Sequence, residues 1–406
     1  MQSPLHTTKK ILINFVISNG GGGHIATYNA LCAIIEQLQL PWQLNLTKVE
    51  ALAERLAAQK KTLDIYRLFG TTSDQVINQA QAKGWKLLQR LTMPLNKLLI
   101  KLHYDVGVKM LEEDWREQQP DLVVSLIPLF NKALWDSVQK AKSGTPVVTI
   151  LTDFADSPPA FWIEPETGNY LLCGTEIAVD QARCLGIKEE LIFKTSGMVI
   201  HPCFYEAIKG DRRNERQSLG LDPDCFTGLV LFGGCGSKVM LEIAKRLECL
   251  QQKIQLIFIC GRNEEMASAL RSIPSLQKRL IITFTQDIPY YMHLADFFIG
   301  KPGPASISEA LVMKLPMIVE CNSGTLPQER YNAEWIRQKQ VGIVIPSFRQ
   351  IKKAVEQFLE PEVFAHYRKN VAGINNRAVF EIPEILQQIL ATSDKTTVAQ
   401  PLEQNK

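Results

Sequence analysis

The chain of 406 residues is 46% hydrophobic and 21% charged, a composition typical of a folded soluble protein. Its length exceeds what one ordinary hydrophobic core accommodates and predicts two domains. Its net charge of +3 is too small to favour nucleic acid as a partner.

The cysteines and the apolar runs indicate the cellular compartment. Nine cysteines occur without a Cys-x-x-Cys pair or a zinc-like Cys/His spacing, which favours reduced, buried thiols of a cytosolic protein. The run Ile11–Ile17 is too short for a signal peptide or a membrane span, and no other run reaches about 18 uninterrupted apolar residues. We therefore expect a cytoplasmic protein, either soluble or peripheral on the cytoplasmic face of a membrane.

Short apolar runs alternate with helical patterns along the chain. In the first half, strands are predicted at 11–18, 43–47, 122–127, 147–151, 170–173 and 192–195, with helices at 26–37 and 106–118. In the second half, strands are predicted at 227–232, 254–260, 280–283, 297–300, 317–319 and 342–344, with helices at 239–251, 265–272, 307–313, 330–337 and 351–358. This alternation predicts an α/β protein with parallel, doubly wound sheets covered on both faces.

The seam between the domains is predicted at Met198–Leu221, where an exposed charge run extends from Asp211 to Arg216. We assign residues 1–205 to an N-terminal and residues 206–375 to a C-terminal Rossmann-like domain. Residues 376–393 are predicted as a helix that can cross back to the N-terminal domain, and the polar residues 394–406 as a disordered tail.

One segment of the first half is basic and amphipathic. Between Gln75 and Tyr104 there are basic residues but no acidic ones, with leucines at near-helical spacing. Such a segment can lie on an anionic bilayer. The membrane contacts would be Trp85, Lys86, Arg90, Lys97 and Lys101. Alternatively, the helix packs on its own domain and exposes its lysines to solvent.

A glycine-rich loop follows the first predicted strand. Gly20–Gly23 can form a turn too tight for side chains, and His24 then starts the next helix. A histidine at this place can act as a base or polarise a substrate hydroxyl at neutral pH. Alternatively, His24 only caps the helix or donates to a loop carbonyl.

Two junctions of the same kind lie in the second half. Phe232–Ser237 and Gly300–Ala310 both contain a glycine-bent loop between a strand and a helix. Such a junction directs backbone N–H groups and the positive end of a helix toward one point, which suits a diphosphate. A plain tight turn is the alternative for Phe232–Ser237. Arg262 could meet a phosphate or a base edge, or it could be an exposed loop charge.

Three polar side chains flank the second of these junctions. Ser306-x-x-Glu309 fits a capping box, in which Glu309 would bond only to its own helix. Alternatively, the Glu309 carboxylate accepts two vicinal ribose hydroxyls. Gln328 and Glu329 open the next helix, where they could bind sugar hydroxyls or act as acceptors in the first turn.

Together these motifs resemble the two-domain glycosyltransferases called GT-B, in particular family 28. That family includes the monogalactosyldiacylglycerol synthases, the processive diacylglycerol glucosyltransferases and, more distantly, the peptidoglycan GlcNAc transferase. The resemblance covers roughly residues 10–345. It rests on the donor-type signature Gly303–Ala310 and the segment Gln328–Ala333. Pro120–Pro128, Pro146–Asp153 and Ile259–Asn263 are more similar to the diacylglycerol branch.

The resemblance implies roles for individual residues. Glu309 would bind the UDP ribose, and Gln328 and Glu329 would contact the donor sugar. The donor-binding residues that it implies are Gly233, Gly234, Gly236, Ser237, Arg262, Gly303, Pro304, Ala305, Ser306, Glu309, Gln328, Glu329 and Asn332. Gly21, Gly22 and Gly23 would form the acceptor-side loop.

The resemblance also implies an inverting transfer, in which an acceptor hydroxyl attacks the anomeric carbon of a UDP-sugar and UDP leaves. Backbone N–H groups of Gly233–Ser237 and Gly303–Ser306 would stabilise UDP, with no metal and no cofactor required. The base would be His24 or Asp153, with Asp156 third; Asp153 follows a strand, at a sheet edge where cleft residues collect.

Three functions are compatible with these motifs. The first is transfer of a hexose to a diacylglycerol-like lipid at an anionic membrane surface. The second is a soluble glycosyltransferase for a small-molecule acceptor, and the third is a UDP-sugar-binding protein or epimerase on the same fold. Two departures from the family pattern matter here: Ala305 replaces a usual glycine, and Asp156–Trp162 differs from the acceptor segment expected for galactolipid synthesis.

Overall fold

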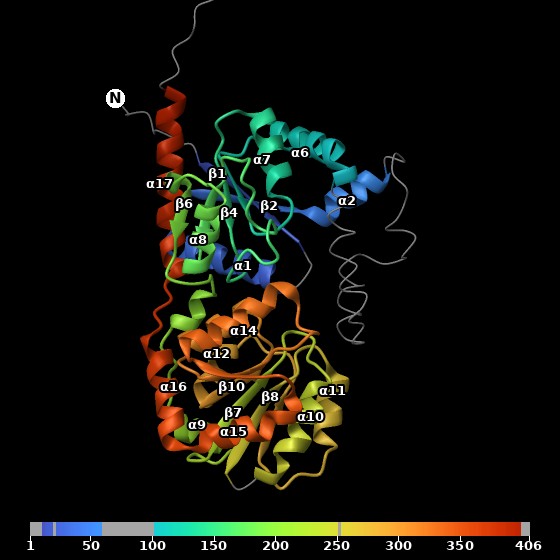
Figure 1. Ribbon diagram of the computed structural model, residues 1–406, viewed down its shortest axis with the longest axis vertical. Helices are drawn as coiled ribbons and strands as arrows, with labels where there is room; N and C mark the ends of the chain where they lie inside the picture. Colours follow the sequence, from blue (N-terminus) through green and yellow to red (C-terminus); the bar gives the residue numbers. More distant parts are fainter. Residues whose placement is uncertain (1–9, 19–21, 59–100, 251–252, 399–406) are drawn as a thin grey trace, which may run out of the picture.

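The computed structural model describes residues 10–18, 22–58, 101–250 and 253–398 of the chain. It forms two α/β halves stacked along the long axis of the molecule, as Figure 1 shows. Each half is built on one parallel six-stranded sheet.

The first sheet has the order β2-β1-β3-β4-β5-β6. Its strands are β1 (Ile11–Ile17), β2 (Trp42–Lys48), β3 (Leu122–Ser125), β4 (Val147–Ile150), β5 (Tyr170–Cys173) and β6 (Ile192–Lys194). The helices of this half are α1 (Gly22–Gln37), α2 (Val49–Ala58), α6 (Tyr104–Gln118), α7 (Asn131–Ala141) and α8 (Glu176–Cys184). Strands β3 and β4 are buried along their whole length, as expected for parallel strands covered on both faces.

The second sheet has the order β12-β11-β10-β7-β8-β9. Its strands are β7 (Phe226–Leu231), β8 (Ile254–Ile259), β9 (Arg279–Ile282), β10 (Phe297–Gly300), β11 (Met317–Glu320) and β12 (Gly342–Ile345). Its helices are α9 (Arg212–Ser218), α10 (Val239–Leu247), α11 (Glu264–Arg271), α12 (Ile288–Leu294), α13 (Pro304–Val312), α14 (Pro327–Lys339), α15 (Ile351–Leu359) and α16 (Pro361–Gly373). All predicted strands of both halves are present.

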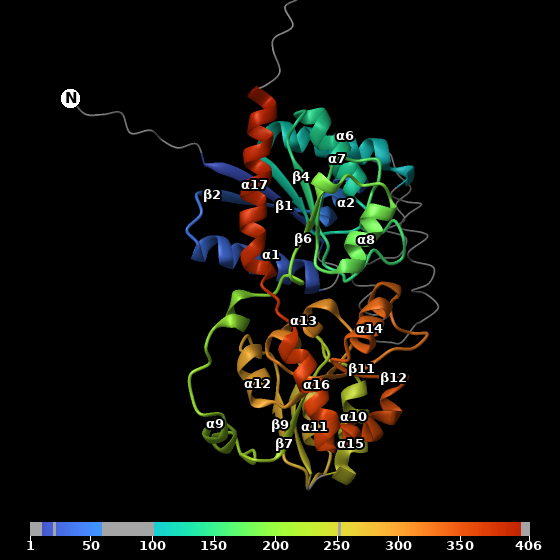
Figure 2. The ribbon, with the colours of Figure 1, turned by 60° about the vertical axis from the view of Figure 1, so that its left-hand side comes forward.

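The last helix, α17 (Ala378–Val398), returns to the first half. Val379, Ile382 and Leu386 are buried in the same cluster as Ile13 on β1 and Leu31 on α1. Figure 2 shows α17 lying along the first half while α16 stays on the second. The helix extends to Val398, so the start of the predicted disordered tail is helical, and residues 399–406 lie outside the described part.

Two segments of the chain connect the halves, and hydrogen bonds join these segments to each other. Asn376 Nδ2 donates to the Met198 carbonyl at 2.8 Å, and the Arg377 N–H donates to Ser196 Oγ at 2.6 Å. A Cβ added to Gly197 would lie 2.6 Å from the Asn376 side chain, so the two crossing segments touch. The chain therefore passes between the halves twice at one place.

The predicted seam differs from the structure in one respect. The charge run begins with Asp211, which caps the short helix α9, and Arg216 on that helix is only 4% exposed. Its guanidinium donates to the Leu294 carbonyl and to Asp296 Oδ2 at 2.7 and 2.9 Å. The prediction of an exposed run was wrong for Arg216, because sequence alone does not show which charge in a run finds buried acceptors.

Candidate active site

The candidate site lies where the carboxyl ends of the two sheets face each other. In the second sheet, β7 and β10 are neighbours although they are far apart in sequence, and in the first sheet β1 and β3 are neighbours in the same way. Loops that leave such a pair diverge and open a crevice, where ligands bind in α/β folds. The predicted glycine-rich loops follow β1, β7 and β10.

The loop after β7 is held by the turn after β8. The Arg262 N–H donates to the Gly234 carbonyl at 2.8 Å, and Asn263 Nδ2 donates to the Cys235 carbonyl at 3.0 Å. Because C=O and N–H point in opposite directions across a trans peptide, the Cys235 N–H points away from that turn. Gly261 has φ +61°, and a Cβ there would lie 2.2 Å from the Gly234 carbonyl oxygen, so this contact requires glycine.

Two other predicted residues of this loop have local roles. Gly233 and Gly236 have φ of +75° and +61°, and the Gly236 N–H donates to the Gly233 carbonyl at 3.3 Å. Ser237 Oγ accepts from the Val239 N–H at 3.3 Å, so its hydroxyl caps the first turn of α10. The Gly236 N–H is therefore used within the loop, whereas the Ser237 hydroxyl accepts one hydrogen bond and can still donate its own O–H to an anion.

The loop after β10 leads directly into α13. Gly303 is the N-cap and Pro304 is the first helical residue. The Gly303 N–H donates to the Lys301 carbonyl at 2.8 Å, and proline has no N–H. Of the donors predicted over Gly303–Ser306, only Ala305 and Ser306 keep N–H groups without a partner within the helix. These two amides point out of the positive end of α13.

Glu309 does not take part in a capping box. The capping box requires Ser306 as N-cap, but α13 starts at Pro304, which makes Ser306 the third helical residue. No residue that the structure describes donates a hydrogen bond to the Glu309 carboxylate. Burial raises the pKa of Glu309 to about 7. A half-buried carboxyl group without a protein partner is suited to accepting ligand hydroxyls.

The first turn of α14 lies beside this loop. Glu329 is 8% exposed, and its Oε1 lies 3.0 Å from Lys301 Nζ. Asn332 is fully buried, and its Nδ2 donates to the Pro302 carbonyl at 2.9 Å. The Asn332 amide NH₂ therefore holds the loop, while its Oδ1 is buried without a partner among the described residues. Gln328 is half-buried at the helix start.

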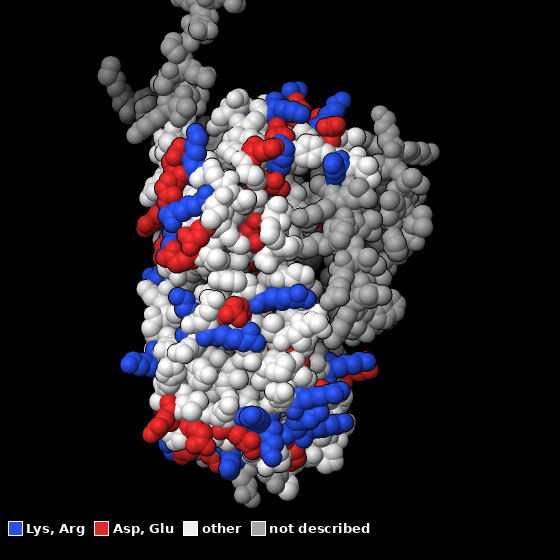
Figure 3. All heavy atoms as spheres, in the orientation of Figure 1, with Lys and Arg blue, Asp and Glu red and all other residues white. Residues whose placement is uncertain are grey.

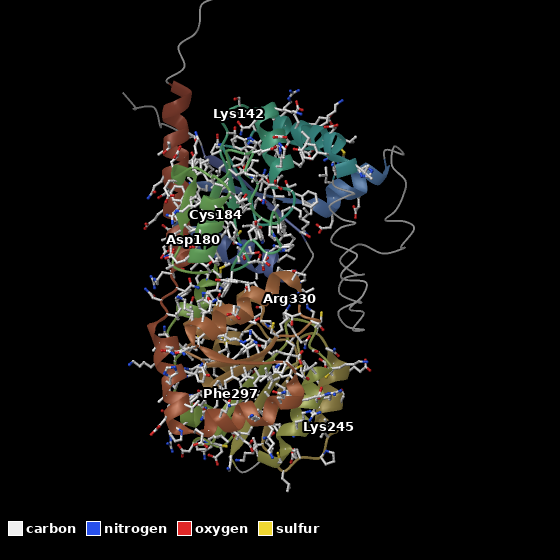
Figure 4. The ribbon with its side chains drawn as sticks, viewed as in Figure 1. Lys142, Asp180, Cys184, Lys245, Phe297 and Arg330 are labelled. Atoms are coloured by element: carbon white, nitrogen blue, oxygen red, sulfur yellow. The ribbon has the colours of Figure 1, made fainter. Side chains whose placement is uncertain are left out.

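Arg330 fixes the approach to this turn. Its guanidinium donates to the carbonyls of Thr325 and Ser323, each at 3.2 Å. Figure 4 shows Arg330 on α14 at the boundary between the halves. The loop before Gln328 and Glu329 is therefore braced by a side chain of the helix that follows it.

His24 lies in the first turn of α1. The helix starts at Gly22, four residues earlier than predicted, so Gly22 and Gly23 are helical and do not form a loop. Burial lowers the pKa of His24, against opposing effects of the Leu126 backbone and Glu50. Its Nδ1 is buried and has no hydrogen-bond partner among the described residues, and its ring centroid lies 6.3 Å from that of Trp162. His24 is therefore neutral near pH 7 and can accept a proton.

Asp153 also contacts Trp162. The Trp162 indole N–H donates to Asp153 Oδ2 at 3.0 Å. The pKa of Asp153 is raised to about 7, mainly by burial; the indole hydrogen bond lowers it, Glu329 raises it and Lys301 lowers it. Asp153 is 9% exposed and is the base candidate whose charge interacts with the second half of the molecule.

Asp156, the third base candidate, is a structural residue. Its Oδ1 accepts from the N–H groups of Phe161 and Trp162 at 2.9 and 2.6 Å, and its Oδ2 accepts from Ala160 at 3.0 Å. The side chain is 2% exposed. Since both oxygens are used to shape the loop that carries Trp162, we remove Asp156 from the candidate bases.

The residue after Asp153 joins the two halves. Phe154 is 2% exposed and belongs to a hydrophobic cluster made mainly of residues of the second half. Its ring packs edge-on against Trp335 of α14, with centroids 5.1 Å apart. The position of Asp153 is therefore linked to the helix that carries Glu329.

Sequence reasoning assigned no role to several of these residues. Trp162 stands nine residues after Asp153, and nothing in that spacing predicts their hydrogen bond. Lys301 was visible inside the glycine–proline loop, and its charge was the signal that could have identified it. Phe284 is 51% exposed, and the Arg262 guanidinium lies 5.0 Å from its ring centroid, beside the loop after β7.

Several of the predicted residues cannot be placed. Gly21, Trp85, Lys86, Arg90 and Lys97 lie outside the described residues, whereas Lys101 is described and exposed. Within the described ranges, no helix is long and apolar enough to span a bilayer. In the same ranges, no three His, Cys, Asp or Glu side chains are grouped so as to hold a metal ion.

The outer face of the second half carries a separate basic area. Figure 3 shows Lys and Arg gathered over α10 and α11. A surface depression there is lined by Leu241, Glu242, Lys245 and Arg246. It shares no residue with the candidate site.

Comparison with protein families supports the sequence interpretation. Residues 229–382 match the glycosyltransferase family 28 C-terminal domain, and residues 60–200 match the monogalactosyldiacylglycerol (MGDG) synthase family. The processive diacylglycerol beta-glucosyltransferase of Bacillus subtilis is 21% identical over 410 residues, covering 98% of each chain. Monogalactosyldiacylglycerol synthase 2 of Arabidopsis thaliana is 28% identical over 264 residues, covering 62% of this chain. The chain spans only about half (54%) of that plant relative.

Solved structures confirm the fold. MurG of Acinetobacter baumannii superposes with a TM-score of 0.57 at 11% identity, covering 93% of this chain and 99% of that one. Anabaena HepE, solved in complex with UDP, gives a TM-score of 0.52 at 14% identity, covering 94% of this chain and 100% of that one. The chain thus has the GT-B fold, and its predicted resemblance to family 28 is confirmed.

Proposed function

From the family 28 C-terminal domain and the GT-B fold, we propose that this chain is an inverting glycosyltransferase that moves a hexose from a UDP-sugar to a diacylglycerol-like lipid. The observation that carries the proposal is the set of groups where the two sheets meet. The second half supplies outward-pointing amides and the unpartnered Glu309 carboxylate. The first half supplies the buried base candidates Asp153 and His24.

The donor would be held mainly by backbone. Diphosphate oxygens would accept hydrogen bonds from the Ala305 and Ser306 amides and from the loop after β7. Glu309 would accept the two ribose hydroxyls, and Gln328 and Glu329 would contact the sugar. The exposed Phe284 ring beside Arg262 offers a surface for the uracil base.

Asp153 would act as the base. The acceptor hydroxyl oxygen forms a bond to the anomeric carbon while the bond from that carbon to the β-phosphate oxygen breaks. The electron pair of the broken bond leaves with UDP, and the hydroxyl proton passes to the Asp153 carboxylate. Asp153 is favoured over His24 because its charge interacts with Lys301 and Glu329 of the donor side.

The proposal includes no metal. Helix ends and amides, with a cation nearby, would stabilise the negative charge of the departing UDP. Transfer should therefore continue at an unchanged rate in excess EDTA. A rate that falls with EDTA and returns with Mg²⁺ would contradict this part of the proposal.

The lipid acceptor is supported by the Bacillus subtilis relative, whose alignment extends over nearly the whole chain. A lipid acceptor places the reaction at a membrane surface, for which we propose the cytoplasmic face, where UDP-sugars are available. Membrane attachment would use the basic segment 83–101, of which Lys101 is exposed.

A donor and acceptor screen tests the proposal. The purified protein is incubated with radiolabelled UDP-galactose, UDP-glucose or UDP-GlcNAc and with vesicles that contain diacylglycerol and an anionic lipid. We expect a lipid-soluble labelled product and an equal amount of free UDP. The same assay on Asp153→Asn tests the proposed base. Asp180→Asn serves as its matched control, because Asp180 is exposed on α8 (Figure 4).

Two other results of the screen would indicate the alternative functions. Release of UDP with a water-soluble product only would indicate a small-molecule acceptor. A changed sugar on UDP without release of UDP would indicate an epimerase. Either result would contradict lipid glycosylation.

A further inference from the structure

An ion pair lies between the two helix starts of the donor side. Lys301 Nζ and Glu329 Oε1 are 3.0 Å apart. Lys301 comes directly after β10, two residues before the N-cap of α13, and Glu329 is in the first turn of α14. The lysine side chain is 45% exposed, whereas that of Glu329 is 11% exposed. The ammonium group is thus accessible to a ligand, and the carboxylate holds it from the buried side.

The lysine side chain lies close to Gly303, the N-cap of α13. A Cβ built on Gly303 would lie 3.4 Å from Lys301 Cε and 3.4 Å from Ser306 Oγ. Both side chains therefore lie on the same side of Gly303. A diphosphate placed on the Ala305 and Ser306 amides would lie within reach of the Lys301 ammonium, since a lysine side chain rotates freely about its stem.

We propose, resting on the proposed function, that Lys301 binds the diphosphate of the sugar donor and that Glu329 holds this lysine in place until the donor arrives. The diphosphate carries more negative charge than a single carboxylate and attracts the ammonium away from Glu329. The released Glu329 carboxylate then accepts hydrogen bonds from hydroxyls of the transferred sugar. One exchange of partners completes both the phosphate and the sugar contacts.

The exchange also serves the chemical step. When the bond to the anomeric carbon breaks, its electron pair adds negative charge to the β-phosphate oxygen. A lysine that already contacts the diphosphate stabilises that charge without further rearrangement. Lys301 would thus contribute to both donor binding and departure of UDP.

Binding measurements on the wild type, three variants and one control variant test the exchange. UDP, UMP and uridine are titrated into the full-length wild type, Lys301→Met, Glu329→Gln and the double variant. Lys352→Met is the matched control, because Lys352 forms an exposed 3.8 Å ion pair with Glu356 on α15. Circular dichroism and thermal unfolding verify that each variant is folded.

We expect Lys301→Met to weaken UDP binding about tenfold or more and to leave uridine binding within about twofold. Glu329→Gln should bind UDP about threefold tighter or more, because the lysine no longer has a competing partner. The double variant should match Lys301→Met, since tighter binding requires the lysine. Lys352→Met should change neither affinity.

The outcomes separate this proposal from the proposed function. Equal losses of UDP and uridine affinity in Lys301→Met, or weaker UDP binding by Glu329→Gln, would overturn the exchange. Neither result would contradict the proposed glycosyltransferase function. A wild-type chain that binds neither UDP nor a UDP-sugar would overturn the proposed function and this proposal with it.

Discussion

The two halves of the molecule share one architecture but contribute to the candidate site by different means. The second half offers backbone amides at the start of α13 and in the glycine loop after β7, together with the Glu309 carboxyl group, which has no partner among the described residues. The first half offers side chains packed against one another, with His24 and Asp153 both close to Trp162. Backbone recognition suits a constant diphosphate, whereas side chains can be changed to suit different acceptors.

The largest effect that tests this difference between the halves is expected at Asp153 in the first half. Asp153→Asn should lower kcat/KM about 10²–10⁴-fold, because the hydroxyl proton loses its acceptor. UDP binding should stay within about threefold, since the donor contacts belong to the other half. Transfer assays and UDP titrations measure the two effects, with Asp180→Asn as control. Retained activity would remove Asp153 as the base.

The donor side is tested at Glu309. Glu309→Gln should weaken UDP binding about tenfold to a hundredfold, because an amide replaces the carboxylate that we propose to accept both ribose hydroxyls. The variant should also lose the preference for UDP over 2′-deoxy-UDP. Titration with both nucleotides measures this, with the exposed Glu334→Gln on α14 as control. An unchanged preference would place the ribose elsewhere.

The pH dependence of transfer reports the base. The pKa of Asp153 is about 7, and only the ionised form accepts a proton. The value of kcat/KM should therefore fall about tenfold per pH unit below pH 7 and level off above it. If His24 were the base, the fall of kcat/KM would begin below pH 6.5, because the pKa of His24 is lowered from its usual value of 6.5. A pH–rate profile of the wild type distinguishes the two.

His24 should have a smaller effect. If Asp153 is the base, His24→Ala lowers turnover less than about tenfold, which corresponds to roughly 1.4 kcal/mol of barrier. The loss would come from poorer packing against Trp162 and poorer placement of the acceptor. Turnover at saturating donor is the measurement, and a loss well above tenfold would restore His24 as a base.

The smallest expected effect is on stability. The pKa of Glu309 is raised from 4.5 to about 7 in the folded state, so ionisation favours unfolding as the pH rises between these values. Its unfavourable contribution is absent below about pH 4 and complete above about pH 7. Glu309→Gln should therefore stabilise the fold at pH 8 by about 1–3 kcal/mol and have little effect at pH 4. Denaturant unfolding at both pH values measures the difference.

The strands and glycine loops were accessible from sequence for a local reason. Each strand is a short apolar run, and a turn such as that at Gly261 admits no side chain. Helices with few apolar residues, such as α9, and helices that begin within glycine, such as α1, were missed or misplaced. The positions of two helix starts changed the interpretation of two residues. Because α13 begins at Pro304, Glu309 is not part of a capping box, and because α1 begins at Gly22, His24 lies in a helical turn.

By itself, the sequence determined the two α/β halves, the family resemblance and the glycine-containing loops after β7 and β10, because these depend on local patterns of apolar, glycine and proline residues. Only the tertiary structure decided which charges meet. The contacts of Asp153 with Trp162, of Phe154 with Trp335 and of Lys301 with Glu329 join residues from different loops and helices. Burial in those contacts sets the protonation of the base, and burial is a property of the folded chain and not of any segment.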